Sequence, residues 1–426
     1  MKVLHLSSFD SSGGAARAAY RIHVGLKQIG IDSQMLVQYQ AIRDQTVLTV
    51  EDKVKAKLRS ILDSSISKFR SPTHYLFSPQ WIPDAVAAKV AQIDPDIINL
   101  NWVCNSFLRI ETLLRLQKPL VWTLQDMWPF TGGCHYSLGC DRYQVTCGHC
   151  PQLNSTKEQD LSRWVWQRKA KAWQHLNLAI VAPSQWMAKA AKGSSLFRNL
   201  RIEVIPFGLD TTVFKPLDMR VARDLLNLPQ NKQLVLFGAI DATGDKRKGF
   251  HLLQAALERL RQADWSERIE LIIFGSSAPD NPLDLGFEAH FLGHLHDDLS
   301  LRIAYAAADV MIAPSIEESF GQTASEALAC GTPVVVFRDT GLADIVDHLQ
   351  NGYIAQHCDI QDLAQGIAWI LSSEQHHELR VAARRKAEQA FSFEVVGKQH
   401  LSLYEEILQE TRCNQGLLEA FTHSVL

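Results

Sequence analysis

Short apolar runs alternate with longer segments of mixed character along most of the chain. The runs have the length of buried strands, and the mixed segments place apolar residues at helical spacing. Strands that alternate with helices are typical of an α/β fold built on parallel sheets. The runs that we interpret as strands are residues 2–7, 32–38, 96–101, 119–124, 179–182 and 202–205 in the first half, and 233–240, 269–274, 309–313, 334–337 and 353–355 in the second.

One strand–helix–strand unit in the second half carries most of the functional information. The strand over 309–313 is followed by a predicted helix over 322–330, with Gly331 placed as its C-terminal stop, and then by the strand over 334–337. The helix would begin just past a strand's carboxyl end, where open α/β sheets bind ligands. Its first backbone amides have no partner within the helix and favour an anion such as a phosphate. These amides belong to Gly321, Gln322 and Thr323.

Two glutamates flank the start of this helix. Glu318 lies in the loop before it, and Glu326 lies about two turns further on. Because a carboxylate accepts two hydrogen bonds side by side, it suits a vicinal diol such as a ribose. The unit could therefore hold a diphosphate with a carboxylate on each side. On spacing alone, an ordinary helix with two solvated glutamates is the simpler interpretation.

The composition limits the class of protein. A chain of 426 residues is long enough for two domains. It is 46% hydrophobic and 21% charged, as expected of a globular protein, and its net charge of -3 argues against general nucleic-acid binding. The N-terminal apolar run is too short for a signal peptide, and no run reaches a membrane-spanning length. With eight cysteines and no export signal, we expect a cytoplasmic protein.

The segment from Glu318 to Val334 resembles a known signature. Seven residues separate Glu318 from Glu326, and the run Glu-Ala-Leu-Ala-Cys-Gly-Thr-Pro-Val follows from Glu326. This pattern closely resembles the donor site of retaining glycosyltransferases of family 4, which have the GT-B fold. The resemblance implies two Rossmann-like domains with parallel sheets facing across a cleft. It places an N-terminal acceptor domain at 1–206, a C-terminal nucleotide-sugar donor domain at 207–390, and a helix that returns to the N-terminal domain at 391–426.

The resemblance also implies roles for individual donor-site residues. Glu318 would be the catalytic residue that holds the donor sugar and supports charge at its anomeric carbon, Glu326 would bind the ribose, and Lys248 would bind the diphosphate. Relatives carry a second cation where this chain has Ala239. The donor contacts implied elsewhere are the glycine turn at Gly13 and Gly14, the helix start at Gly321, Gln322 and Thr323, and the base contact at Gly293, His294 and Leu295.

An aromatic and polar loop follows the strand over 119–124, as is common in acceptor sites. It resembles a subgroup of family 4 that acts in colanic-acid and other exopolysaccharide pathways. Relatives carry His where this chain has Gln125, so the resemblance leaves the rate or the donor sugar open. Asp126 and His135 are the neighbouring candidates for a polar role on the acceptor side, and a structural role for either is equally open.

A cysteine-rich insertion spans about 132–153. Cys147 and Cys150 have the two-residue gap of a metal hairpin, whereas the gap between Cys134 and Cys140 is wider. A structural Zn²⁺ would fix the shape of this segment, and a redox pair or four free thiols are the alternatives. We expect no catalytic metal, because four thiolates would close the coordination sphere.

Residues 52–70 combine apolar residues at helical spacing with six basic residues. A helix with this pattern either lies on an anionic membrane as a peripheral contact, at the inner membrane face, or packs on its own domain.

The sequence as a whole predicts a hexosyltransferase-like enzyme. It would move a sugar from a nucleoside-diphosphate sugar to a hydroxyl of a glycan or lipid-linked acceptor, with retention of configuration. A GT-B-fold nucleotide-sugar epimerase and a non-catalytic sugar-nucleotide-binding protein are the alternatives. The donor base, the donor sugar and the acceptor leave no clear trace in the sequence.

Overall fold

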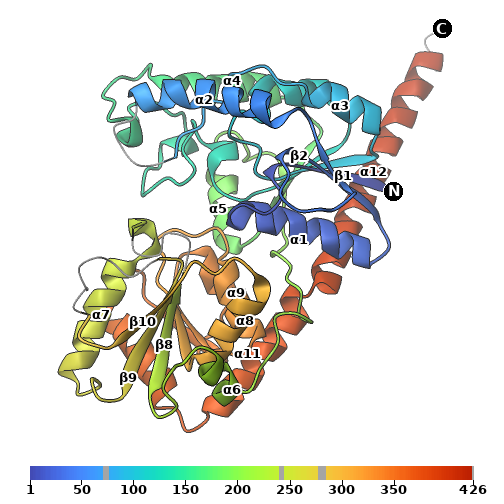
Figure 1. Ribbon diagram of the computed structural model, residues 1–426. Coiled ribbons are helices and arrows are strands. Elements are labelled where there is room, and N and C mark those ends of the chain that lie inside the picture. The colour runs from blue at the N-terminus through green and yellow to red at the C-terminus, as the bar shows by residue number, and fades with distance from the viewer. Residues whose placement is uncertain (71–75, 239–243, 277–284, 425–426) are drawn as a thin grey trace. The chain divides into compact units, whose positions relative to one another are not determined.

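The computed structural model describes residues 1–70, 76–238, 244–276 and 285–424, except for the side chains of 53, 64–70 and 414–424. The chain divides into two compact units (Figure 1). Unit 1 consists of Met1–Ile205 together with Val396–Leu426, and unit 2 consists of Pro206–Val395. Each unit is an α/β structure around its own parallel sheet, which confirms the predicted fold class.

Unit 1 contains a seven-stranded sheet with the order β3-β2-β1-β4-β5-β6-β7, in which every pair is parallel. Its strands are β1 (Lys2–Phe9), β2 (Asp32–Tyr39), β3 (Val47–Thr49), β4 (Ile97–Leu100), β5 (Leu120–Thr123), β6 (Leu178–Ala182) and β7 (Arg201–Val204). Its helices are α1 (Gly14–Gln28), α2 (Lys53–Arg70), α3 (Val86–Ile93), α4 (Leu161–Trp173), α5 (Gln185–Gly193) and most of α12 (Phe393–Ser424).

The inner strands of unit 1 are buried on both faces, as parallel sheets covered by helices require. Every residue of β4, β5 and β6 is buried. The segment between β5 and α4 contains only the short 3-10 turns η2 (Trp128–Phe130), η3 (Arg142–Gln144) and η4 (Pro151–Leu153). Its shape therefore depends on side-chain contacts rather than on regular hydrogen bonding.

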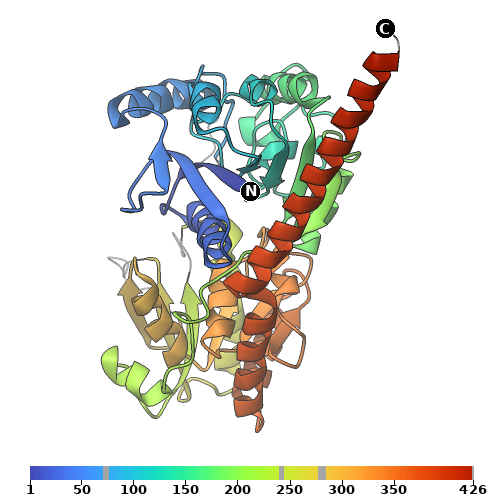
Figure 2. The same cartoon turned by 90° about the vertical axis from the view of Figure 1, so that its right-hand side faces the viewer.

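The C-terminal helix α12 lies along unit 1 over much of its length (Figure 2). Tyr404 of α12 is fully buried, and its hydroxyl accepts a hydrogen bond from Asn99 Nδ2 on β4. At the edge of the sheet, Arg201 of β7 pairs with Glu406 Oε2 at 2.5 Å and with Glu410 Oε1 at 3.3 Å. One buried polar contact and one surface ion cluster thus attach α12 to this sheet.

Unit 2 contains a six-stranded parallel sheet with the order β10-β9-β8-β11-β12-β13. Its strands are β8 (Gln233–Gly238), β9 (Ile269–Phe274), β10 (Ala289–Gly293), β11 (Val310–Ala313), β12 (Val334–Phe337) and β13 (Gly352–Ala355). Its helices are α6 (Met219–Leu225), α7 (Phe250–Gln262), α8 (Asp298–Ala307), α9 (Gln322–Ala329), α10 (Ile360–Leu371) and α11 (His376–Phe391), with short turns η5 (Lys246–Lys248) and η6 (Gly341–Asp344).

The chain order reverses direction within the sheet of unit 2 at β8. After β8 the chain adds β9 and β10 on one side, and then returns to add β11, β12 and β13 on the other. The chain segments that follow β8 and β11 therefore continue towards opposite edges of the sheet. Open α/β sheets bind ligands at such a switch point.

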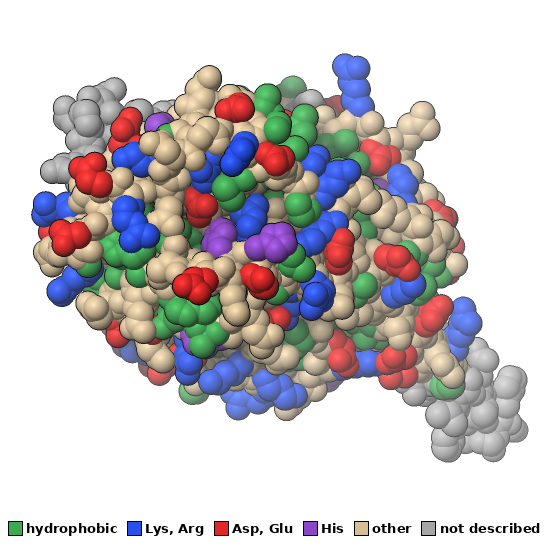
Figure 3. Space-filling view, turned by 90° about the horizontal axis from the view of Figure 1, so that it is seen from below, with side chains coloured by type: hydrophobic (Ala, Val, Ile, Leu, Met, Phe, Trp, Pro, Cys, Tyr) green, Lys and Arg blue, Asp and Glu red, His purple; other side chains and the backbone are tan. Residues whose placement is uncertain are grey.

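The surface of the molecule carries charges of both signs. On the face shown in Figure 3, acidic and basic side chains are interspersed over most of the surface. Among the helices in the described ranges, none combines the length and the apolar character needed to cross a membrane.

Candidate functional site

Three loops of unit 2 meet at the carboxyl ends of β8, β11 and β12. Gly249, which follows β8, approaches the loop after β11 so closely that a Cβ added to it would lie 1.9 Å from the Pro314 carbonyl oxygen. The Ile316 amide donates to the Arg247 carbonyl at 2.8 Å, which joins the same two loops. The Gly341 amide, after β12, donates to the Glu318 carbonyl at 2.8 Å. These contacts fix the loops against one another.

A buried ion pair lies between the first two loops. Lys248 Nζ is 2.6 Å from Glu318 Oε2, and Arg247 Nη1 is 3.8 Å from the same oxygen. Glu318 is 9% exposed. Its burial alone would raise the pKa of the carboxyl, but Lys248 and Arg247 together outweigh burial and hold the pKa of Glu318 below its usual value. Glu318 is therefore an ionised carboxylate at neutral pH.

The predicted anion site at the start of α9 lies next to this pair. Gly321 precedes the helix with a φ of 104°, and a Cβ there would lie 2.1 Å from Leu342 Cδ2, so only glycine fits. Gln322 and Thr323, the first two helical residues, are partly exposed, whereas every later residue of the helix is buried. The start of the helix therefore lies nearer the surface than the rest of the helix, at the end whose amides favour an anion.

Glu326 lies further along α9 and is 3% exposed. Its Oε2 accepts a hydrogen bond from the Tyr305 hydroxyl of α8 at 2.7 Å. Tyr305 itself is fully buried between Phe214 and Phe274. This partner was not predictable from the sequence, because Tyr305 has the pattern of an ordinary core position in an amphipathic helix.

The residues implied for base recognition follow β10 at the same edge of the sheet. Gly293 ends the strand, and its carbonyl accepts from the Gly275 amide after β9 at 2.7 Å. His294 is exposed, and its ring lies 6.2 Å from that of His296, while Leu295 is half-buried. The structure thus brings Lys248, Glu318, the start of α9 and the residues after β10 to the carboxyl edge of one sheet, while Glu326 lies within α9. Ala239, which stands where relatives carry a second cation, lies outside the described residues.

Unit 1 carries its own glycine turn at the end of β1. Gly13 has a φ of 86° and immediately precedes α1, in which Gly14 is the first residue. No heavy atom would lie within 4 Å of a Cβ at Gly13, so its surroundings are open. The turn is therefore needed for its backbone conformation rather than for close packing.

The acceptor-side candidates form a buried cluster after β5. Asp126 Oδ2 is 2.6 Å from His135 Nδ1 and accepts from Trp102 Nε1 at 2.9 Å. His135 Nε2 is 2.9 Å from the Ser78 hydroxyl. Gln125, which is 7% exposed, is bound at 3.3 Å to an asparagine side chain that follows β4. The sequence predicted the three candidates but neither Trp102 nor Ser78, since both come from distant segments.

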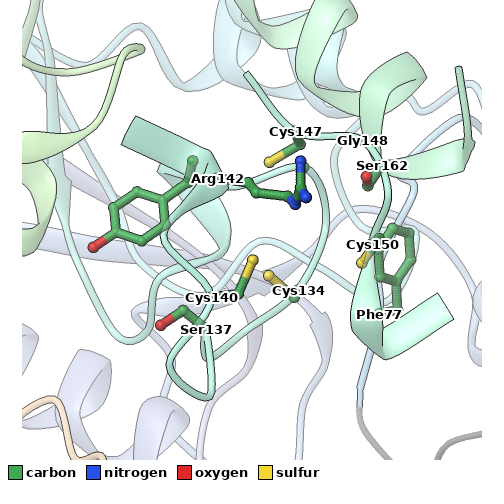
Figure 4. A pocket seen from close by; sticks show the side chains of 11 residues that line it. Phe77, Cys134, Ser137, Cys140, Arg142, Cys147, Gly148, Cys150 and Ser162 are labelled. Carbon is green, nitrogen blue, oxygen red and sulfur yellow. The ribbon is translucent and has the colours of Figure 1, made fainter. Parts of the chain in front are cut away.

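The four cysteines of the insertion line one pocket in unit 1, together with side chains of neighbouring turns (Figure 4). Within the described residues, a group of three potential metal ligands has its donor atoms within 4.8 Å of one another at Glu270, Glu288 and His290. This group lies away from the cysteines, in unit 2. His290 Nε2 already lies 2.7 Å from Glu270 Oε2, which is an ordinary pairing between neighbouring strands.

Two family models match successive parts of the chain. Residues 12–213 match the model of Glycosyltransferase Family 4, and residues 224–390 match that of Glycosyl transferases group 1. The chain is 24% identical over 373 residues to the putative colanic acid biosynthesis glycosyl transferase WcaC of Escherichia coli, covering 81% of this chain and 85% of that protein. It is 32% identical over 205 residues to D-inositol 3-phosphate glycosyltransferase 2 of Catenulispora acidiphila, covering 45% of this chain and 47% of that protein. The chain thus spans about half the length of that relative.

Solved structures share the fold over nearly the whole chain. Sucrose-phosphate synthase from Thermosynechococcus elongatus superimposes with a TM-score of 0.67 at 22% identity, covering 96% of this chain and all 100% of that one. Anabaena HepE in complex with UDP-glucose gives a TM-score of 0.63 at 20% identity, covering 95% of this chain and 100% of that one. At these identities the likeness concerns the fold.

Proposed function

The chain belongs to the GT-B glycosyltransferases, with a family 4 domain followed by a group 1 domain, and on that premise we propose that it transfers a glycosyl group from a nucleoside-diphosphate sugar to an acceptor hydroxyl. The donor diphosphate would bind at the carboxyl edge of the unit 2 sheet. The colanic-acid relative supports an acceptor in polysaccharide or glycoconjugate synthesis. The HepE structure, which is a complex with UDP-glucose, supports a nucleotide-sugar donor.

The observation that carries the proposal is the arrangement around Glu318. Lys248 and Arg247 lie on one side of this buried carboxylate, and the start of α9 follows it by a few residues. Cations and helix-start amides stabilise a departing diphosphate, because its negative charge grows as the glycosidic bond breaks. No metal is needed for that step in this proposal, since fixed positive groups are already present.

Glu318 would act on the other product of bond cleavage. As the bond to the diphosphate breaks, positive charge develops at the anomeric carbon of the donor sugar. A carboxylate held ionised by neighbouring cations can support that charge and bind the sugar hydroxyls. Glu326 would bind the ribose, with the Tyr305 hydroxyl fixing one of its carboxylate oxygens. We propose retention of configuration on the strength of the family signature.

Asp126 and His135 would serve the acceptor. Their buried pairing gives a polar group that can orient an acceptor hydroxyl, and Trp102 supplies an adjacent aromatic surface of the kind that sugars contact.

The experiment is turnover of candidate donors by Glu318→Gln. Release of nucleoside diphosphate is measured with UDP-, GDP- and ADP-glucose in the presence of acceptor sugars. We expect the variant to lose roughly 10²- to 10³-fold in kcat with little change in nucleotide affinity. Interconversion of the donor sugar without transfer would instead indicate an epimerase. Nucleotide binding without any turnover by the wild type would indicate a binding protein.

We propose, in addition, that α2 is a peripheral contact with an anionic membrane, such as the inner face of the cytoplasmic membrane. Four apolar side chains of α2 are more than half exposed: Val54 by 71%, Leu58 by 57%, Ile61 by 54% and Leu62 by 54%. Ala56 and Asp63 are buried against unit 1, so the exposed residues lie away from the core. Lysines at positions 55 and 57 provide positive charge next to this apolar surface.

The membrane contact is tested by sedimentation with vesicles. Wild-type protein should sediment with phosphatidylglycerol-containing vesicles and not with phosphatidylcholine alone. The double variant Leu58→Glu/Ile61→Glu should lose this binding. A matched variant, Val381→Glu, changes an apolar residue of unit 2 that is 43% exposed and should bind like the wild type. Equal sedimentation of all three proteins would contradict the proposed contact.

A further inference from the structure

We propose that Cys134, Cys140, Cys147 and Cys150 together bind one structural Zn²⁺. All four line the same small pocket, about 20 Å³ in volume, which is enough for one ion (Figure 4). Thiolates are soft ligands that select zinc among the common divalent ions, and four of them close its tetrahedral shell. The site would therefore hold the fold and take no part in the chemistry. The inference goes beyond the proposed glycosyl transfer and does not rest on it.

The backbone around the cysteine pair resembles a ligand loop. Gly148 and His149, which separate Cys147 from Cys150, have φ values of 138° and 47°. This turn brings the two sulfur-bearing residues to the same side. The backbone amides of Leu153 and Ser155 then donate to the Cys150 carbonyl at 3.2 and 3.0 Å. The Cys150 amide donates to Asp160 Oδ2 at 2.8 Å, so the backbone that carries this cysteine is fixed on both sides.

A second set of contacts involves Cys147, whose side chain packs closely against the backbone of Gly132. A Cβ added at Gly132 would lie 2.6 Å from Cys147 Cβ and 2.9 Å from Cys147 Sγ, so the backbone at this point can only be glycine. Two pieces of chain, one carrying Cys134 and one carrying Cys147, are thus held in direct contact beside the pocket.

A basic side chain is buried near the thiols. Four thiolates with one Zn²⁺ carry roughly two net negative charges, and a buried site of that charge needs a compensating cation. Lys169 of α4 is fully buried, and burial disfavours its protonated form, whereas charge on Cys134 and Cys147 would favour it. Its ammonium also donates to the Trp128 carbonyl and, at 3.1 Å, to the Thr131 carbonyl. Arg142 lines the pocket itself (Figure 4).

The sulfur atoms are more widely spaced than a bound ion would hold them, because no three of them lie within 4.8 Å of one another in this part of the described chain. Metal binding would therefore draw the cysteines together while their protons pass to solvent. The surrounding segment permits such a shift, since it contains short 3-10 turns in place of longer helices or strands.

The site has a consequence for the acceptor-side cluster. Cys134 directly precedes His135, whose Nδ1 lies 2.6 Å from Asp126 Oδ2. Gly133, on the other side of Cys134, would place a Cβ 2.5 Å from Phe77. A metal bound to Cys134 would hold this backbone in place and, with it, the orientation of the His135 ring. Loss of the metal should loosen the pairing of His135 with Asp126.

The test is the zinc content of the full chain purified without added metal or chelator. We expect roughly one zinc per chain by elemental mass spectrometry, and release of that zinc when the thiols are titrated with a mercurial. The variants Cys147→Ser and Cys140→Ser should each lower zinc content severalfold. The matched control Cys358→Ser, which changes a half-buried cysteine of unit 2, should retain it.

Cobalt gives a second readout that does not depend on a variant folding. Co²⁺ exchanged into the wild type should produce the intense visible bands of a tetrahedral thiolate complex. Zinc-free wild-type protein with four rapidly reacting thiols in this segment would overturn the proposal. A protein mass that is lower by two hydrogens per cysteine pair would also overturn the proposal, because it would show a disulfide.

Discussion

Replacing His400 by phenylalanine should reduce the acid sensitivity of unit 1. His400 of α12 is fully buried, and burial lowers its pKa to about 3. Its neighbours are Tyr404, at a ring distance of 5.6 Å on the same helix, and His5 of β1. His5 is also fully buried and has its pKa lowered by burial, then by His23 and His400. His23 of α1 has its pKa lowered to about 4 by burial and by Lys27.

The sign and size of the effect follow from these values. A histidine whose pKa is lower in the folded state than in the unfolded chain stays neutral when folded but takes up a proton when unfolded. The folded state therefore has its full stability above about pH 6.5. It loses stability as the pH falls from there towards the pKa that the histidine has in the folded state. Between about pH 6.5 and pH 5, each such histidine costs about 2 kcal/mol of stability, at about 1.4 kcal/mol per pH unit. His400→Phe removes one of the three contributions and keeps an aromatic ring beside Tyr404.

The assay is guanidinium unfolding followed by tryptophan fluorescence at about pH 7.5 and about pH 5. Eight of the ten tryptophans lie in unit 1, so the signal reports mainly on that unit. The loss of stability between the two pH values should be smaller in His400→Phe than in the wild type by about 2 kcal/mol. The control is His175→Gln, at an exposed position. If His400→Phe and the wild type lose the same stability on acidification, the burial argument is wrong.

Further predictions concern both units. Lys248→Met should lower turnover by roughly 10²-fold through loss of the cation beside the buried carboxylate, whereas Lys246→Met, at an exposed neighbour, should be nearly neutral in the same assay. Gly249→Ala should lower the melting temperature of unit 2 by several degrees, because the φ of Gly249 is 75° and an added Cβ would meet a carbonyl oxygen. Gly293→Ala should lower the melting temperature less, because Gly293 has a φ of 66° but open surroundings. Tyr404→Phe should cost about 1 to 2 kcal/mol in chemical unfolding, since it leaves a buried amide without its acceptor.

The sequence predicted the inner strands within a residue or two, because each is a short apolar run buried on both faces. It did not predict β3 or β10, which are edge strands. The residues of β10 are half-buried throughout and show no continuous apolar run. β3 is only three residues long. The other two edge strands, β7 and β13, were predicted, so an edge position alone does not hide a strand from a local pattern.

The candidate site was predictable where the chemistry is local. Glu318 was predicted from the signature, Gly321 from the start of the helix and Lys248 from the wider resemblance, and the structure brings them to one edge of the unit 2 sheet. Partners from distant segments were not predictable. Tyr305 is bound to Glu326, and Trp102 to Asp126, yet both aromatic residues fit an ordinary core pattern in the sequence. Hydrogen bonds between separate elements depend on side-chain directions that periodicity alone does not give.

The most direct test of the central claim is thermal stabilisation by UDP, GDP and ADP, measured on the wild type and on Glu326→Ala. A ligand that binds the folded state raises the melting temperature according to its affinity. We expect one nucleotide to stabilise the wild type by several degrees and to stabilise Glu326→Ala much less, because the variant lacks the ribose contact. If none of the three nucleotides stabilises the wild type, the carboxyl edge of the unit 2 sheet is not a nucleotide-sugar site and the proposed function is contradicted.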